Sequence, residues 1–470
     1  MTWLVALGGI WAISLATILL RVAHQKWLSI IWTLALPHCV LVYQLLTAHY
    51  PSFAFPMTVA NAFGSAVWGA VFLFHLPEYD VELPLRLRIM MGGRRIYMTS
   101  LVAAVLHVPV YFALFLWGHL LNLTAESVGW DLVVTLSVLG FFLFVGALRI
   151  FITSRRLGIN RRILLILFVW VPGVNITLGI WFCRIVKQEF IHDFLQAELQ
   201  AAREDSQICA TRYPLLLLHG VGFRDCDRLN YWGRIPMRLK RNGATVYYGH
   251  QQAWGKVEDN AVEIQSELRG ILANTGAEKV NIIAHSKGGL DARYLISSLN
   301  MWPHVATLTT MSTPHRGSEL LQVLDKLPER IYRRVCRWIN IYFGIAGDHA
   351  PNAYMASRQL HPDFLKQFNE KNIDAPGVYY QSYAAEMKSP MSHSLLMAPF
   401  TIMKLISANN DGLVTIDSAK WGVFKGTFKS AELRGISHGD LIDLMRQDYD
   451  GFNMAEEYVK IVAELKDMGY

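Results

Sequence analysis

The sequence has few charged residues and few cysteines, and both shortages limit what the chain can be. Charged residues make up 17% of its 470 residues, whereas hydrophobic residues make up 53%. This composition excludes an ordinary soluble globular protein, and the length predicts two or three domains. The five cysteines lack the spacing of a metal site. We interpret them as unpaired hydrophobic residues, with a Cys209–Cys226 bridge as the alternative.

Six long apolar runs fill the first half of the chain. They lie near residues 3–20, 27–48, 57–76, 97–121, 129–148 and 163–182. Each is long enough to cross a bilayer as a helix, which takes about 20 residues. Lipid offers no partner to a free backbone group, so such runs cross it as helices. Residues 1–187 are therefore predicted to form an all-α transmembrane bundle of about six helices.

Lys and Arg are absent from the second and fourth loops between these runs, around residues 47–56 and 121–131, whereas the odd loops are basic. Basic loops usually stay cytoplasmic, so the N-terminus is predicted to lie outside. Six spans then place the second half on the extracytoplasmic side, and a miscount of one span reverses this. The net charge of +7 is thus explained by topology, so we expect a lipid bilayer as partner and no nucleic acid. Since the charges lie in loops, an ion pathway is not expected.

The second half has a different pattern. Residues 188–212 contain neither Pro nor Gly and predict a linker helix. Beyond them, strands are predicted within residues 213–223, 243–250, 279–285, 304–318, 377–383 and 400–407. Between the second and third strands, residues 258–276 place Ala261, Ile264, Leu268, Ile271 and Leu272 on one helical face, with Gly276 as the stop. Alternating strands and helices predict a mostly parallel sheet over residues 213–470, covered on both faces.

A serine stands in a tight turn between a predicted strand and a predicted helix. The segment reads Ala284-His285-Ser286-Lys287-Gly288, close to the G-x-S-x-G turn of a nucleophile elbow, with Ala replacing the first Gly. Small residues are needed on both sides because the turn is cramped. We interpret Ser286 as a nucleophile, and the alternative is a structural serine at a turn.

A serine nucleophile needs a base, and in this fold the chain order is Ser, acid, His. "SANNDGLV" places Asp411 in a turn after an apolar run, and "GISHGDL" places His438 in a later loop. His438 is the predicted general base and Asp411 the residue that orients it. The alternatives are Asp417 or Asp440 as the acid, and His285, His315 or His393 as the base.

An oxyanion needs backbone N–H groups aimed at the developing charge. One is expected from the residue after the nucleophile, Lys287. The other is expected from the loop after His219-Gly220, at Val221.

Residues 213–470 resemble the bacterial triacylglycerol lipases of the Pseudomonas–Burkholderia type and their clostridial relatives. The resemblance is carried by "YPLLLLHGVGF", "AEKVNIIAHSKGGLDARY", "LTTMSTPHRGSEL", "NNDGLV" and "SHGDLID". It implies an α/β-hydrolase fold, ester hydrolysis and a triad of Ser286, Asp411 and His438, in agreement with the pattern of the residues themselves. Residues 1–198 lie outside it.

The resemblance also raises two structural expectations. Such lipases often hold calcium near the catalytic histidine with two aspartates, and Asp440 matches one of them. Between Asp374 and Asp411 the only acidic residue is Glu386, so no cofactor is expected and calcium stays an alternative. In these lipases the region that matches residues 319–347 carries a lid. A lid-like insertion is therefore predicted near 319–370, and an ordinary amphipathic helix is the alternative.

The sequence therefore predicts a membrane-anchored serine ester hydrolase that acts on acyl esters of lipids. An acyltransferase with the same triad is one alternative. A catalytically inactive hydrolase lobe on a membrane sensor or interaction protein is the other.

Overall fold

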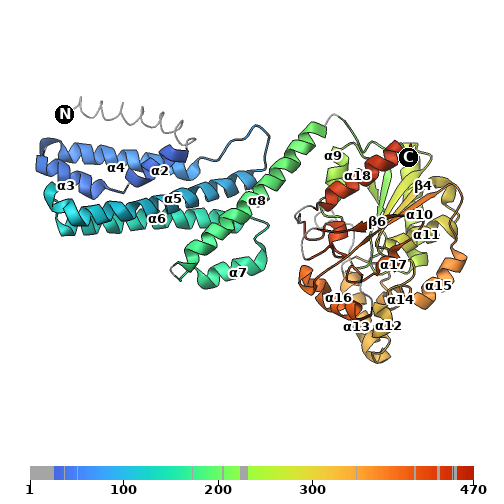
Figure 1. Ribbon diagram of the computed structural model, residues 1–470. Helices are drawn as coiled ribbons and strands as arrows, with labels where there is room; N and C mark the ends of the chain where they lie inside the picture. The colour runs from blue at the N-terminus through green and yellow to red at the C-terminus, as the bar shows by residue number, and fades with distance from the viewer. Residues whose placement is uncertain are drawn as a thin grey trace. The chain divides into compact units, whose positions relative to one another are not determined.

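The computed structural model describes residues 26–35, 37–49, 51–171, 173–203, 206–222, 231–345, 347–406, 409–430, 434–446, 448 and 452–470. The chain forms two compact units, Met1–Ala202 and Arg203–Tyr470. The first unit consists of helices and the second of a sheet with helices on both faces (Figure 1).

The first unit contains α2 (Lys26–Ala35), α3 (Cys39–His49), α4 (Pro51–Phe74), α5 (Leu85–Trp117), η1 (Gly118–Leu121), α6 (Ala125–Thr153), α7 (Gly158–Phe168) and α8 (Val174–Arg203). Helices α5 and α6 pack along each other, and apolar side chains such as Phe112, Phe115 and Phe144 point out of the unit. An outward apolar surface on long helices is typical of a membrane protein.

The apolar runs match the helices only in part. In the part of the chain that the structure describes, three helices are long and apolar enough to cross a membrane: Ala54–Phe74, Leu85–Leu121 and Ala125–Thr153. Run 27–48 forms a pair, Ser29–Ala35 and Val40–Ala48, bent by 63°, which would make a fourth span if it counts as one. Run 3–20 lies outside the described residues.

The prediction of one helix over residues 163–182 is wrong. This run is divided between α7 and α8, and Gly173 between them has a φ of +81°. A left-handed backbone ends a helix. The residues after the break continue without interruption into the predicted linker, because α8 reaches Arg203.

One charge lies inside a run, contrary to the expectation that the charges lie in loops. Asp131 is buried in α6. Its Oδ2 accepts a hydrogen bond from the hydroxyl of Tyr111 on α5 (2.8 Å) and lies 2.6 Å from Nδ1 of His38. A carboxylate is tolerated in such a place because polar partners from other segments reach it, and the sequence pattern does not show those partners.

Helices α5 and α6 approach closely at Gly93 and Gly146. A Cβ added to Gly146 would lie 2.8 Å from the backbone N of Tyr97 and 2.9 Å from the carbonyl O of Gly93. Small residues allow the backbones of membrane helices to approach each other. The packing of these two helices therefore depends on glycine at this point.

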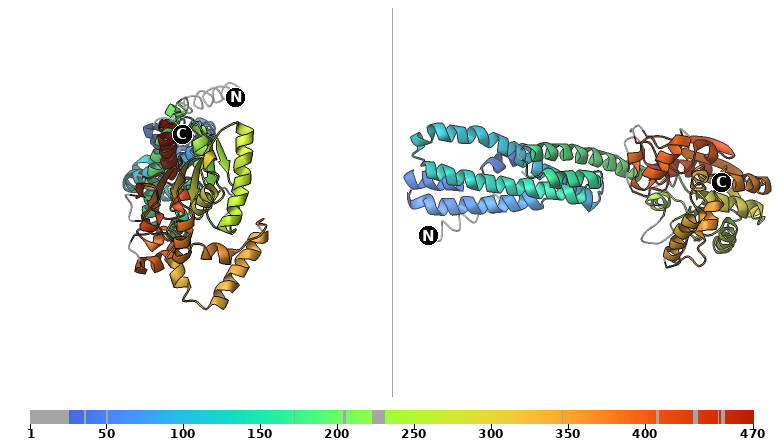
Figure 2. Two further views of the ribbon diagram at one scale, coloured as in Figure 1. Left: turned by 90° about the vertical axis from the view of Figure 1, so that its right-hand side faces the viewer. Right: turned by 90° about the horizontal axis from the view of Figure 1, so that it is seen from below.

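The second unit is built on a six-stranded parallel sheet, in the order β2-β1-β3-β4-β5-β6. Its strands are β1 (Leu215–Leu218), β2 (Val246–Tyr248), β3 (Val280–His285), β4 (Val305–Met311), β5 (Tyr379–Ala385) and β6 (Val423–Phe428). Helices α9 (Ile235–Arg241) and α18 (Met454–Asp467) cover one face, and α10 (Val257–Thr275) and α11 (Gly288–Ser297) cover the other (Figures 1 and 2).

The sequence of β1 explains why both faces are covered. Leu215 and Leu217 pack on the α9–α18 side, whereas Leu216 and Leu218 pack on the α10–α11 side. A strand with apolar residues at every position needs two covered faces, since side chains alternate along it. The predicted parallel α/β fold is confirmed.

Most predicted elements of this unit are present. Helix α10 has the predicted face and ends at Gly276, whose φ is +69°. The prediction of a strand over residues 400–407 is wrong, because these residues belong mostly to α16 (Met397–Ile406). A short apolar run fits a buried strand and a buried helix equally well. Strand β6 was not predicted, and its half-exposed sequence VFKGTF has little apolar signal.

The remaining helices lie in the connections. Between β4 and β5 the insertion supplies α12 (Leu320–Leu324), α13 (Glu329–Ile345), α14 (Ala353–Arg358) and α15 (Pro362–Lys371). Helix α17 (Ile416–Ala419) precedes β6, and short helices η2 (Trp302–His304), η3 (Pro390–Ser392), η4 (Ser394–Leu396) and η5 (Asp440–Ile442) complete the unit.

We expect Gly146→Val to destabilise the first unit, because the new side chain would force α5 and α6 apart. Overpacking of this kind costs about 1–3 kcal/mol. The measurement is thermal unfolding in detergent. Gly140→Val on the same helix is the matched control, since a Cβ added to Gly140 meets no atom within 4 Å. Equal losses in the two variants would show that the crossing is not responsible.

Candidate active site

Ser286 lies in a strained turn between β3 and α11. Its φ is +54°, a conformation that residues other than glycine rarely adopt. The N–H of Ser286 donates a hydrogen bond to the carbonyl of Met311 at the end of β4 (3.0 Å). A Cβ added to Gly288 would lie only 2.5 Å from the carbonyl O of His219, so the second glycine of the motif is required by space. The turn therefore has the geometry of a nucleophile elbow.

His438 and Asp411 form a buried pair. Nδ1 of His438 lies 2.7 Å from Oδ2 of Asp411, and the His438 N–H donates to the Asp411 carbonyl (2.9 Å). The other carboxylate oxygen of Asp411 accepts from the N–H groups of Leu413 and Val414 (3.0 and 2.8 Å). These bonds fix the carboxylate and orient the imidazole, which is the arrangement needed to support a base.

The pair lies beside the turn that holds Ser286. The ring of His438 is 4.4 Å, centroid to centroid, from the ring of His285, the residue immediately before Ser286. Ser286, Asp411 and His438 are all buried or nearly so, and all follow the carboxyl ends of strands or their loops. The structure thus brings the three predicted residues to one edge of the sheet.

The alternative acid and base residues have other surroundings. Asp417 is exposed and pairs with Lys420 at 2.7 Å. His315 is buried, and its Nε2 lies 3.1 Å from the hydroxyl of Thr310. Among the described residues, the only imidazole within hydrogen-bond distance of Asp411 is that of His438.

The two expected oxyanion donors border the same turn. Lys287 precedes α11, and Val221 follows Gly220, whose added Cβ would lie 2.7 Å from the Cβ of Ser286. Within the described part of the chain, neither the Lys287 N–H nor the Val221 N–H has an acceptor, so both can serve an oxyanion. The side chain of Lys287 is turned inward, where Nζ donates to Asp291 (2.7 Å).

A hydrogen-bonded chain that the sequence did not reveal connects the loops of Gly220, His285 and His438. The Tyr231 hydroxyl accepts from the Gly220 N–H (2.9 Å) and lies 2.7 Å from Nδ1 of His285, which accepts the hydroxyl proton because Nε2 of the neutral ring faces a carbonyl. Nε2 of His285 then carries the hydrogen and donates to the carbonyl of His438 (3.2 Å). Burial, together with the neighbouring His438, holds the pKa of His285 well below its usual range. His285 therefore stays neutral, as this chain requires.

Comparison with known proteins agrees with this geometry. The family model described as palmitoyl protein thioesterase matches residues 214–434. Triacylglycerol lipase 2 of Saccharomyces cerevisiae is 31% identical over 263 residues, which cover 52% of this chain and 75% of that protein. The triacylglycerol lipase of Pseudarthrobacter phenanthrenivorans is 38% identical over 235 residues, 45% of this chain and 73% of that protein. The chain belongs to the triacylglycerol lipase family.

The resemblance predicted for residues 213–470 is therefore confirmed, and the chain is a carboxylic ester hydrolase. The crystal structure of the mature lipase BlEst2 of Bacillus licheniformis aligns with 50% of this chain and 88% of that chain, at 20% identity and a TM-score of 0.39.

The surroundings of Asp440 do not fit a calcium ion. Its Oδ2 accepts from Nη2 of Arg434 (2.9 Å) and from both the N–H and the hydroxyl of Ser437 (2.8 Å each). Calcium needs several free oxygen ligands, and here a guanidinium already balances the carboxylate. Glu386, the other acidic candidate, lies 3.7 Å from Nζ of Lys429. Lipases and esterases of this fold generally need no cofactor.

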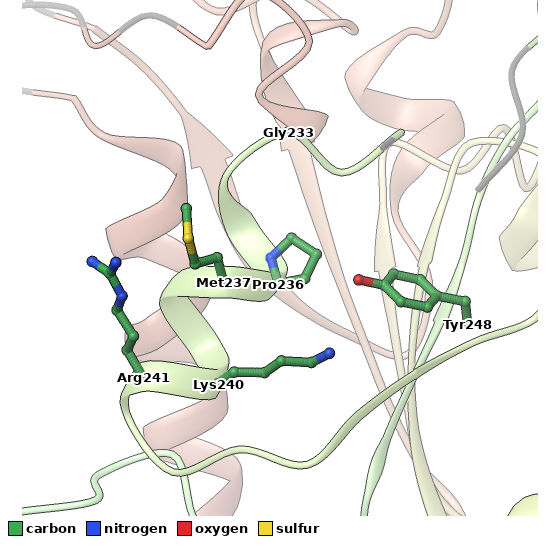
Figure 3. A pocket seen from close by; sticks show the side chains of 6 residues that line it. All are labelled: Gly233, Pro236, Met237, Lys240, Arg241 and Tyr248. Carbon is green, nitrogen blue, oxygen red and sulfur yellow. The ribbon is translucent and has the colours of Figure 1, made fainter. Parts of the chain in front are cut away.

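A surface pocket of about 420 Å³ lies beside α9 and β2 (Figure 3). It is lined by Gly233, Pro236, Met237, Lys240, Arg241 and Tyr248. It contains no serine, histidine or carboxylate that could attack an ester or serve as a base. The pocket is thus separate from the candidate active site.

Tyr231→Phe should lower kcat for ester hydrolysis about 10-fold or more with little change in KM. The variant keeps the ring but leaves the Gly220 N–H without its acceptor, and an unsatisfied buried donor costs about 1–3 kcal/mol. Steady-state kinetics on a soluble ester measures both constants. Tyr380→Phe is the control, because the Tyr380 hydroxyl also accepts from a backbone N–H, that of Ala375 (3.0 Å). An equal fall of kcat in both variants would contradict a positioning role.

Chelation of calcium should change neither the stability nor the activity of the hydrolase unit, since the Arg434 guanidinium already forms an ion pair with the carboxylate of Asp440. We expect the same thermal unfolding and the same hydrolysis rate with and without a chelator. Arg434→Gln, in contrast, should destabilise the unit, because a buried carboxylate loses its counter-charge. A fall in stability of the parent protein with chelator, restored by calcium, would refute this assignment.

Proposed function

We propose that the chain is a membrane-anchored serine ester hydrolase that cleaves acyl esters of lipids through an acyl-enzyme on Ser286. The observation that carries the proposal is the buried His438–Asp411 pair beside the left-handed turn of Ser286. A serine becomes a nucleophile when a base accepts its proton, and a base works when its orientation and charge are supported.

The reaction has two halves. Oγ of Ser286 attacks the ester carbonyl while Nε2 of His438 takes its proton, and Asp411 stabilises the resulting imidazolium. The N–H groups of Lys287 and Val221 stabilise the oxyanion. His438 then gives the proton to the departing alcohol, which leaves an acyl-serine. Water then attacks the acyl-serine while His438 takes its proton, and His438 returns this proton to Oγ of Ser286 as the fatty acid leaves.

The first unit supports the anchoring part of the proposal. Its long apolar helices have the length that a bilayer requires, and many of their side chains face outward. An anchored enzyme stays close to substrates that reside in the membrane. The side of the bilayer depends on how many of the apolar runs cross it, and reporter fusions to the two ends of the chain decide between the two arrangements.

The relatives, which are triacylglycerol lipases, support acylglycerols as the substrate class, and the matching thioesterase model supports thioesters as the second class. Parallel assays with a triacylglycerol, a phospholipid and an S-palmitoyl peptide compare these classes. Adding an alcohol acceptor separates hydrolysis from acyl transfer, since hydrolysis yields only free acid. The insertion at residues 319–370 is the proposed lid, because it leaves the sheet after β4 at the same edge as Ser286.

Ser286→Ala should abolish labelling by a fluorophosphonate probe and lower ester hydrolysis by more than about 10³-fold. The probe is applied to membranes that contain the full chain, and labelling is read on a gel. Ser312→Ala is the matched control, because Ser312 is also buried, follows the neighbouring strand β4 and has a positive φ of +44°. It should be labelled like the parent.

Two results would overturn the proposal. Labelling that persists in Ser286→Ala would place the nucleophile elsewhere. Absence of labelling in the folded parent protein would favour an inactive hydrolase lobe.

A further inference from the structure

Helix α13 presents an apolar stripe to the solvent. Its inner side holds Tyr332, Cys336 and Phe343, and the Tyr332 hydroxyl donates to the hydroxyl of Ser357 on α14 (2.6 Å). Five large apolar residues on the outer side are between 51% and 84% exposed: Ile331, Val335, Trp338, Tyr342 and Ile345. Their spacing of four, three, four and three residues puts them in one line along the helix.

A row of arginines runs beside this stripe. Arg330, Arg333, Arg334 and Arg337 are all exposed. At 100° per residue they fall on one arc of the helix, next to the apolar line. Arg333 pairs with Glu329, the only acidic residue of α13. In the described part of the chain, the other three arginines have no carboxylate partner.

We propose that α13 docks the hydrolase unit on an anionic phospholipid surface. A helix with a large apolar face and a strongly basic flank is suited to the boundary between headgroups and acyl chains. The stripe enters the acyl boundary, and Arg330, Arg334 and Arg337 bind lipid phosphates. The charge argues against a second copy of the chain, because two such helices would bring arginine against arginine.

When α13 lies on the lipid surface, the carboxyl edge of the sheet, which carries the candidate active site, faces that surface. Helix α13 follows the carboxyl end of β4, and η4 and α16 follow that of β5. Parallel strands end at the same edge, so both connections arise where Ser286 and His438 lie. On the β5 connection Met391, Leu395 and Leu405 are at least 70% exposed. Figure 1 and the left view of Figure 2 show α13 and α16 at the same, lower end of the hydrolase unit.

The docking surface would place lipid beside the site where the proposed reaction occurs. Binding does not require turnover, so it is measured independently of the role of Ser286. Failure of the docking proposal therefore leaves the proposed function untouched, and the reverse also holds.

The test uses the full chain in phosphatidylcholine nanodiscs and added vesicles, with co-flotation as the readout. We expect binding to vesicles of phosphatidylcholine mixed with phosphatidylglycerol, little binding to phosphatidylcholine alone, and a decrease as salt rises. The combined variant Arg330→Gln, Arg334→Gln and Arg337→Gln should partition on the order of 100-fold more weakly, since each basic side chain near an anionic surface contributes about fivefold.

The control variant removes the same charge elsewhere. Arg269, Lys366 and Lys371 are exposed on α10 and α15, and their replacement by Gln should leave binding nearly unchanged. Trp338→Ser tests the stripe, with Trp302→Ser, another exposed tryptophan, as its control. Thermal unfolding of each variant confirms that it folds.

Three results would overturn the proposal. One is equal binding to neutral and anionic vesicles. Another is equal loss of binding in the α13 variant and in its control. The third is self-association that Trp338→Ser abolishes in the absence of vesicle binding, which would identify a second copy as the occupant.

Discussion

The left-handed backbone of Ser286 is the constraint on which the hydrolase unit depends. A residue held in this conformation costs about 1–3 kcal/mol, so its surroundings must fix it. Strand β3 and helix α11 hold its two sides, and Gly288 leaves room for the carbonyl of His219. Gly220 lies against the serine itself. The turn therefore determines which residues are allowed in two other loops as well as in its own.

Buried polar groups are satisfied by partners from distant parts of the chain. In the hydrolase unit, the Lys287–Asp291 pair under the turn is completed by Asn260 of α10, which donates to Asp291 (3.0 Å). In the helical unit, the buried carboxylate of Glu189 accepts from Arg86 (2.5 Å) and from the Ser154 hydroxyl (2.6 Å). An unpaired charge in either place would be costly. Both units thus use polar pairs to fix the packing of their elements.

Apolar surface has two different uses in this chain. In the helical unit it covers long helices on their outward sides, where a bilayer would replace water. In the hydrolase unit most of it is buried against the two faces of the sheet, and the exceptions are concentrated on α13 and near α16. On α13 a row of exposed arginines lies beside the exposed apolar stripe. The two units therefore offer a membrane different chemistry.

The sequence by itself determined the elements whose signal is local. A short stretch of consecutive residues is enough to predict the turn at Ser286, the apolar face of residues 258–276 or a fully apolar strand. Tertiary structure decided the rest, because short apolar runs such as 400–407 fit helix and strand equally, and a weakly apolar edge strand such as β6 is defined by its neighbour. The partners of Asp131, and the chain from Tyr231 through His285 to His438, join residues far apart in sequence. Only folding brings such groups within hydrogen-bond distance.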